Sequence, residues 1–85
     1  MKRYVAVFRS LTDVLSFIYD LNSLGATAHA VETPKQTAVG CGISAEFSIS
    51  ELPLALKLIK FKGYQSFFGV FKYEKRGGKV IVERI

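Results

Sequence analysis

Two amphipathic segments with helix start and stop signals divide this short chain, and β-rich stretches lie before, between and after them. In the first segment Ser10 is a typical helix N-cap, Asp13 lies three residues later, apolar residues recur at helical spacing, and Gly25 ends the run. In the second, Ser48 or Ser50 caps a helix that runs to about Lys62. The fold must therefore pack two helices against strands.

The remaining segments have the composition and alternation of β-strands. They are residues 3–9, 27–32, 43–47 and 65–74, with residues 79–85 as a hairpin partner after the turn at 76–78. The order strand, helix, strand, strand, helix, strand predicts an α+β, ferredoxin-like sandwich with an added C-terminal strand. At 85 residues, positions 1–85 form a single domain.

Composition narrows the classes of protein. The apolar run before Arg9 is only five residues long, too short for a signal peptide or a membrane span, which predicts a cytoplasmic protein with no membrane partner. One cysteine allows neither an internal disulfide nor a Cys-rich zinc site. No nucleotide-binding motif is present, so we expect no metal and no cofactor.

The positive charge is concentrated in the C-terminal third. Residues 57–85 carry eight Lys or Arg against two Glu, which gives +6, whereas residues 1–56 carry four against five acids, which gives −1. This asymmetry favours an anionic partner or, alternatively, forms a solvated edge.

The single cysteine, Cys41, lies between Gly40 and Gly42 in a segment that is neither helix nor strand throughout. In a split βαβ arrangement this segment lies at the end of the sheet where the first helix begins, away from the turn at 76–78. A helix N-terminus and nearby lysines favour a reactive thiolate, and exposed loop amides bind anions. The predicted substrate- or anion-binding residues around catalytic Cys41 are Thr33, Lys35, Gly40, Gly42, Ser10, Lys60 and Lys62. A structural thiol, or a short helix over residues 34–39 whose C-terminus opposes ionisation, remains the alternative.

The second helix carries two apolar stripes. One contains Leu52, Ala55, Leu56 and Ile59, and the other, on nearly the opposite face, contains Leu54, Leu58 and Phe61. Because a helix over a sheet needs only one stripe, the second predicts an interface with a second copy of the chain. The alternative is one broad stripe with a partly exposed flank.

The middle of the chain resembles the selenium/sulfur carrier-like family of small bacterial domains. The resemblance runs over about residues 4–73 and is carried by Thr33, Pro34, Lys35, Cys41, Gly42 and Phe47. It implies that Cys41 accepts sulfane sulfur or selenium as a persulfide-type adduct and passes it on, with donor and acceptor proteins as partners. Residues 74–85 lie outside the resemblance. The resemblance therefore favours a carrier or binding protein over a true enzyme.

Two other functions remain open. A regulatory or assembly module would act through protein contacts, with Cys41 incidental. Single-stranded RNA binding is suggested by the aromatic segment SFFGVFKY, but this segment belongs to the fourth strand, whereas the RNP1 motif belongs to the third. Nucleic acid is therefore not the favoured partner.

Overall fold

Five strands and two α-helices make up the fold in the computed structural model, which describes residues 2–37 and 42–85. The elements are β1 (Lys2–Phe8), α1 (Leu11–Ser23), β2 (His29–Glu32), the 3₁₀ helix η1 (Lys35–Thr37), β3 (Ile43–Phe47), the 3₁₀ helix η2 (Ile49–Glu51), α2 (Leu52–Lys62), β4 (Phe67–Arg76) and β5 (Lys79–Arg84). The predicted α+β class is confirmed. Neither α-helix in these described ranges is long and apolar enough to cross a membrane.

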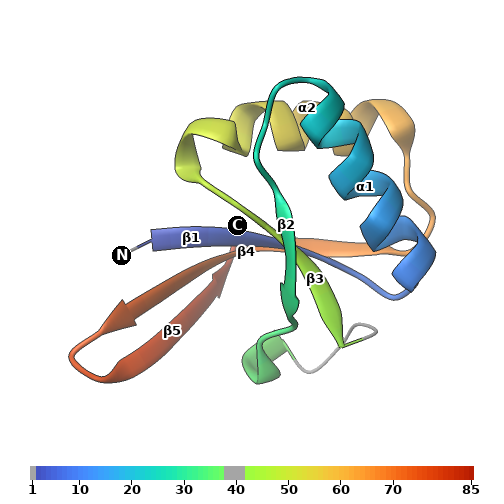
Figure 1. Ribbon diagram of the computed structural model, residues 1–85. Helices are drawn as coiled ribbons and strands as arrows, with labels where there is room; N and C mark the ends of the chain where they lie inside the picture. Colours follow the sequence, from blue (N-terminus) through green and yellow to red (C-terminus); the bar gives the residue numbers. More distant parts are fainter. Residues whose placement is uncertain (1, 38–41) are drawn as a thin grey trace.

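The strands form one sheet in the order β2-β3-β1-β4-β5, and all neighbours are antiparallel. β1 and β2 therefore point the same way with β3 between them, as in the split βαβ arrangement assumed from the sequence. Strands twist relative to their neighbours, and Figure 1 shows β2 crossing β1 at a steep angle. The end of β2 is consequently carried away from the end of β1, where α1 begins.

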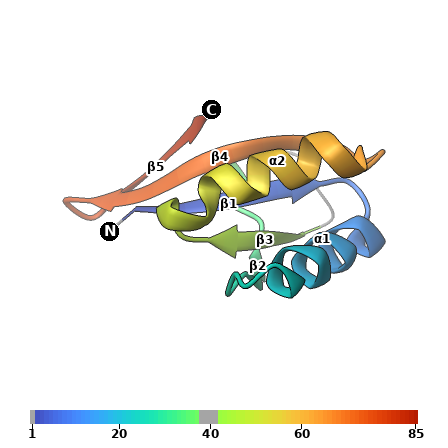
Figure 2. The same ribbon diagram turned by 90° about the horizontal axis from the view of Figure 1, so that it is seen from above.

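Both helices lie on the same face of the sheet, while the β4–β5 hairpin extends past them at the end where the N-terminus lies (Figures 1 and 2). Alternation along β1 sends Tyr4, Ala6 and Phe8 toward the helices. The core on this side includes the fully buried Phe17 and Phe47. The predicted inward set of β3, with Ile43, Ala45 and Phe47 on one face, is confirmed.

A second apolar cluster lies on the opposite face of the sheet. Its buried members are Val5, Val7 and Phe71, against which Val31, Phe68 and Val82 pack. Val5 is only 1% exposed, although both α-helices cover the other face. The cluster draws on strands β2, β1, β4 and β5, so the curled sheet itself shelters these side chains.

The second strand begins later than predicted, at His29 rather than at residue 27. Side chains outside the sheet engage the backbone here: Asn22 donates to the Ala28 carbonyl at 2.9 Å and accepts from its N–H at 2.7 Å. The N–H of Thr27 donates to Oε2 of Glu51 at 2.7 Å. Alternation in the sequence cannot distinguish these bonds from a strand ladder.

Glu51 ties the start of α2 to the loop before β2. Its Oε2 also accepts from Oγ1 of Thr27 at 3.1 Å, and its Oε1 accepts from the N–H of Ser48 at 3.0 Å. Burial raises the pKa of this carboxyl, but the hydrogen bonds from Ser48 and Thr27 outweigh burial and lower the pKa below its usual 4.5. Of the two serines predicted to cap this helix, Ser48 is the one that pairs with Glu51, and α2 ends at Lys62 as predicted.

The predicted hairpin is present, with β4 at residues 67–76 rather than 65–74, and its turn uses Gly77 and Gly78 at φ +56° and +81°. β5 ends opposite Phe71, so the outer edge of β4 before that residue lacks a partner strand among the described residues. There the guanidinium of Arg84 donates to the Phe68 carbonyl and lies 4.5 Å from the Phe68 ring centroid. It also occupies the space above Gly69, where an added Cβ would meet Nε of Arg84 at 2.9 Å.

Candidate functional site

The segment that contains Cys41 starts at Thr33 and ends at Gly42, and hydrogen bonds join its two ends to each other and to β3. The N–H of Thr33 donates to the carbonyl of Gly42 at 2.9 Å, and Oγ1 of Thr33 lies 2.7 Å from Oγ of the fully buried Ser44. Gly42 has φ +93°, in the left-handed region that favours glycine. Cys41 and Gly40 lie outside the described residues. Thr33 and Gly42, two predicted site residues, are therefore in direct contact.

A hollow of about 370 Å³, here called the sheet hollow, lies beside this point on the helix-free face. Its lining comes from the middle of the sheet, from the segment after β2 and from the β4–β5 hairpin: Val5, Val31, Glu32, Thr33, Pro34, Lys35, Gln36, Glu46, Tyr73 and Val80. β2 and β5 are the two edge strands of the sheet. Residues from both edges reach one hollow because the sheet curls around it.

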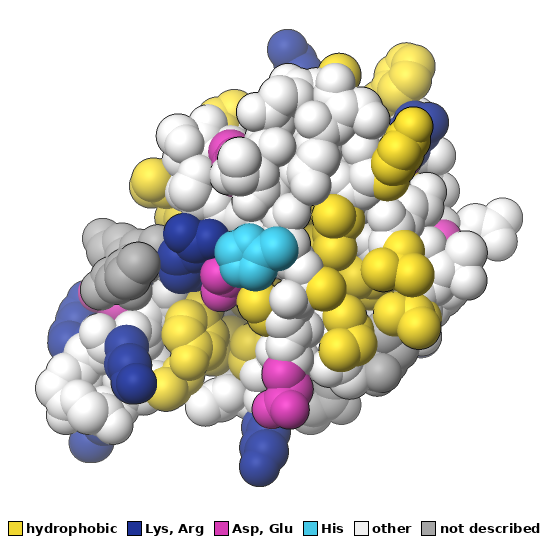
Figure 3. Space-filling model, viewed as in Figure 1, with side chains coloured by type: hydrophobic (Ala, Val, Ile, Leu, Met, Phe, Trp, Pro, Cys, Tyr) yellow, Lys and Arg dark blue, Asp and Glu magenta, His cyan; other side chains and the backbone are white. Residues whose placement is uncertain are grey.

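The polar floor of the sheet hollow is built on Glu46. Its Oε1 lies 3.1 Å from an Arg3 terminal nitrogen, accepts from Arg3 Nε at 3.2 Å and lies 3.0 Å from Nε2 of His29. Three neighbouring strands supply these residues, and Figure 3 shows the histidine on the surface beside a basic and an acidic side chain. No hydrogen bond from a described residue reaches Oε2 of Glu46. One carboxylate oxygen is thus held by the protein and the other is available.

Ser10 caps α1, as predicted, whereas its predicted place beside Cys41 concerns residues outside the described ranges. Its Oγ accepts from the N–H of Asp13 at 3.4 Å, and its own N–H donates to Oγ of Ser66 at 3.1 Å. Oδ2 of Asp13 in turn accepts from the N–H and Oγ of Ser66 at 3.0 and 2.5 Å. Ser10 therefore belongs to a group of hydrogen bonds that joins the start of α1 to the residue before β4, and it does not line the sheet hollow.

The two predicted lysines of α2 also lie elsewhere. Nζ of Lys62 is 3.8 Å from Oδ2 of Asp20 on α1, and Lys60 lines a different depression between α2 and β4. The same Asp20 oxygen accepts from the Tyr64 hydroxyl at 2.7 Å. Burial, followed by Asp20, raises the pKa of Tyr64 well above its usual 10.0. Of the predicted basic residues, Lys35 alone lines the sheet hollow within the described ranges.

The 76–78 turn lies beyond the N-terminal end of β1, at the end of the sheet opposite the start of α1, as predicted. Val80, just after the turn, nevertheless shares the sheet hollow with Lys35 of η1. Strand twist and the length of the hairpin, which sequence patterns do not report, bring these residues together.

The predicted interface residues Leu54, Leu58 and Phe61 do line one apolar hollow, of about 380 Å³, together with Leu24 and Lys57. Their expected separation from the core is wrong for Leu58, which is 7% exposed and belongs to the helix-side core, and for Leu54, which packs against that core. Phe61, by contrast, is 86% exposed. The helix has one broad stripe with an exposed edge, and the interface stays a prediction.

Sequence reasoning missed Glu46, Tyr73 and Val80 as residues that share the sheet hollow with Thr33 and Lys35. It also missed Arg3 as the partner of Glu46. One signal was present: in the third strand, Glu46 stands between the inward residues Ala45 and Phe47, which points its carboxylate to the helix-free face. The described residues include no group of three or more His, Cys, Asp or Glu placed to hold a metal ion.

The antiparallel sheet with two helices on one face, and the pinned segment around a single cysteine, define a small α+β domain with a candidate thiol site. Residues 3–66 match the model of the family described as "Putative Se/S carrier protein-like", and the chain belongs to this family. No curated protein and no solved structure matches the chain.

Proposed function

We propose that the protein carries sulfur or selenium on Cys41. The observation that carries this proposal is the family match over residues 3–66, which spans the segment with the only cysteine of the chain. Thr33 and Gly42, at the two ends of that segment, are hydrogen-bonded to each other at the sheet hollow. The implied partners are donor and acceptor proteins, and a single free thiol fits the reducing cytoplasm.

The transfer step balances without a further reagent. The Cys41 thiolate attacks the outer sulfur of a donor persulfide R–S–SH, the donor S–S bond breaks, a Cys41 S–S bond forms, and RS⁻ leaves. An acceptor nucleophile later removes the outer sulfur and regenerates the Cys41 thiolate. A donor of the form R–S–SeH would deliver selenium in the same way. Lys35 belongs to the same segment as Cys41 and is exposed at the sheet hollow. Its positive charge supports the proposal, because positive charge near a thiol favours the thiolate.

The first test treats the reduced protein with a low-molecular-weight persulfide and measures the intact mass. We expect a gain of one sulfur atom that dithiothreitol removes, and none in Cys41→Ser. The alkylation rate of Cys41 against pH should give a thiol pKa below the reference of about 8.5. The proposal would be contradicted if the native protein gained no sulfur, or if Cys41→Ser gained as much sulfur as the native protein.

We also propose that the fold is ferredoxin-like with β5 added at one edge. The strand order β2-β3-β1-β4, together with both helices on one face, supports this classification.

A further inference from the structure

The sheet hollow presents three polar groups that the described protein leaves available. They are Oε2 of Glu46, the Tyr73 hydroxyl and the Lys35 ammonium, and no hydrogen bond or ion pair with a described residue engages any of them. No described side-chain nitrogen or oxygen is buried without a partner, so these three groups are open to solvent and accessible to a bound molecule. At about 370 Å³ the hollow falls at the lower end of the range of about 300–1,000 Å³ found for ligand sites.

The apolar part of the lining is aliphatic. Val5 forms the buried floor, and Val31, Pro34 and Val80 stand around it. Polar and apolar surface thus occur together in one small site. This mixture suits a ligand with a short hydrocarbon or backbone segment and polar ends, and it does not suit a lipid tail.

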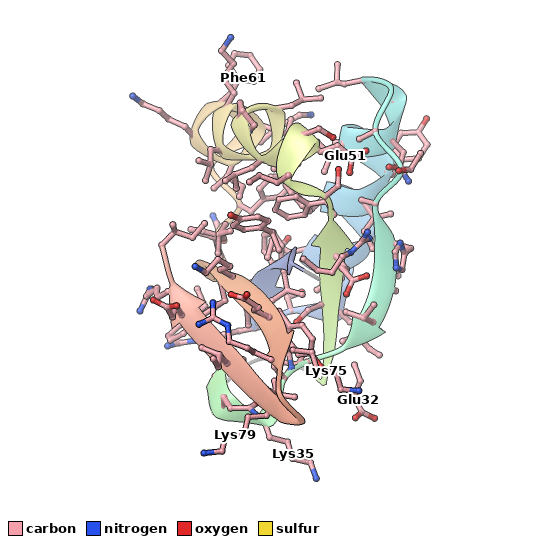
Figure 4. All side chains as sticks on the ribbon, turned by 90° about the vertical axis from the view of Figure 1, so that its left-hand side faces the viewer. Glu32, Lys35, Glu51, Phe61, Lys75 and Lys79 are labelled. Carbon is pink, nitrogen blue, oxygen red and sulfur yellow. The ribbon has the colours of Figure 1, made fainter. Side chains whose placement is uncertain are left out.

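The rim charge favours a negatively charged end on that ligand. Lys35 lies on η1 and lines the hollow. Lys75 is the cross-strand partner of Val80, another lining residue, and therefore lies on the same face of the hairpin. Figure 4 shows Lys35, Lys75 and Lys79 gathered at one end of the molecule, with Glu32 among them. These lysines are exposed and make no ion pair with a described residue. The two carboxylates of the hollow differ in their surroundings: Glu32 is exposed to solvent, whereas Glu46 is paired with Arg3.

We propose that the sheet hollow binds an amino acid or short peptide. Its carboxylate pairs with Lys35 at the rim, an ammonium or amide N–H donates to Oε2 of Glu46, and the Tyr73 hydroxyl supplies a further hydrogen bond. The aliphatic part of the ligand lies against Val5 and Val80. Where Cys41 carries sulfur, a bound cysteine or cysteine peptide is the small-molecule donor or acceptor, and this assignment alone rests on the proposed function.

Binding can be measured without sulfur chemistry by using Cys41→Ser and an S-methylated Gly-Cys-Gly tripeptide. In ¹⁵N–¹H spectra we expect saturable shifts at the amides of Val5, Val31, Glu46, Tyr73 and Val80, and unchanged amides on the outer face of α2. Tyr73→Phe should weaken binding by about 2- to 10-fold, as expected for one neutral hydrogen bond.

The charge pairing is tested by combining a lysine variant with a ligand variant. Lys35→Gln should weaken binding of the tripeptide at least about 5-fold, while Lys60→Gln, which removes a lysine outside the hollow, should not. The C-terminal amide of the tripeptide should bind Lys35→Gln and the parent protein equally. Inorganic phosphate is the competitor that detects a simple anion site.

The inference is overturned if the tripeptide gives no saturable shifts, if Lys60→Gln weakens binding as much as Lys35→Gln, or if phosphate reproduces the shifts and displaces the tripeptide. A protein that takes up persulfide sulfur on Cys41 but binds no peptide would retain the proposed function and lose this inference. A protein that binds the peptide but takes up no persulfide sulfur would retain this inference and lose the proposed function.

Discussion

Glu51→Gln tests how a single carboxylate joins the start of α2 to the loop before β2. In the native protein Oε1 accepts from Ser48 and Oε2 accepts from two donors of Thr27, at 2.7–3.1 Å. A glutamine offers only one acceptor oxygen, so it must lose the Ser48 bond or both Thr27 bonds. Each lost bond costs about 0.5–1.5 kcal/mol, and the partial exposure of Glu51 keeps the total near 1–2 kcal/mol.

The loss should depend on pH in a defined direction. Because the folded-state pKa of Glu51 is lowered below 4.5, its carboxylate stabilises the fold above that value and stops doing so as the pH falls through the folded pKa. Near pH 7 the free energy of unfolding in urea should therefore fall by about 1–2 kcal/mol and the Tm by about 4–16 °C. Near pH 2 the variant and the native protein should converge, since both then carry a neutral side chain.

Far-UV circular dichroism during urea unfolding gives both quantities. Glu32→Gln is the matched control, because Glu32 is exposed and accepts no hydrogen bond from a described residue, and it should change stability little. Equal stability of Glu51→Gln and the native protein at neutral pH, or the same loss at both pH values, would refute the reasoning.

Other parts of the fold give further expected outcomes. Tyr64→Phe removes the hydroxyl that donates to Asp20 at 2.7 Å and should cost about 1–2 kcal/mol at neutral pH. Because the pKa of Tyr64 is raised, native stability should decline as the pH rises above 10.0, and alkaline urea unfolding should show less decline in the variant. Asn22→Ala removes both hydrogen bonds to Ala28, and urea unfolding should show a loss of about 1–3 kcal/mol; a loss below about 0.5 would contradict this account. If the apolar hollow on α2 receives a second copy, Phe61→Ser should convert a dimer to a monomer in sedimentation with little change in Tm, since Phe61 is 86% exposed; a native monomer would exclude this interface.

The elements could be read from sequence where local signals agree. The inward set Ile43, Ala45 and Phe47 followed from alternation, and the end of α2 followed from Gly63, which adopts the left-handed conformation at φ +61°. The start of β2 was missed because the side chains of Asn22 and Glu51, which lie outside the sheet, supply the hydrogen bonds of Ala28 and Thr27.

The surroundings of the candidate site depended on long-range geometry. Pattern and spacing placed Ser10 near the Cys41 segment, because an untwisted sheet aligns the ends of parallel strands. In the twisted sheet Thr33, Pro34 and Lys35, which follow β2, share a hollow with Tyr73 and Val80. No local pattern reports the angle between two strands that are separated by a third, so the hollow and its Glu46 floor could not be assembled from sequence.

The contact between Arg84 and Gly69 couples two positions fifteen residues apart. Any side chain at position 69 must displace the guanidinium that covers the Phe68 carbonyl on the outer edge of β4. Related chains should therefore change the two positions together, with a larger residue at 69 accompanied by a shorter one at 84. A chain that lost Arg84 alone would expose an unpaired strand edge on β4. We expect such a chain to self-associate at high concentration, with little change in its melting temperature.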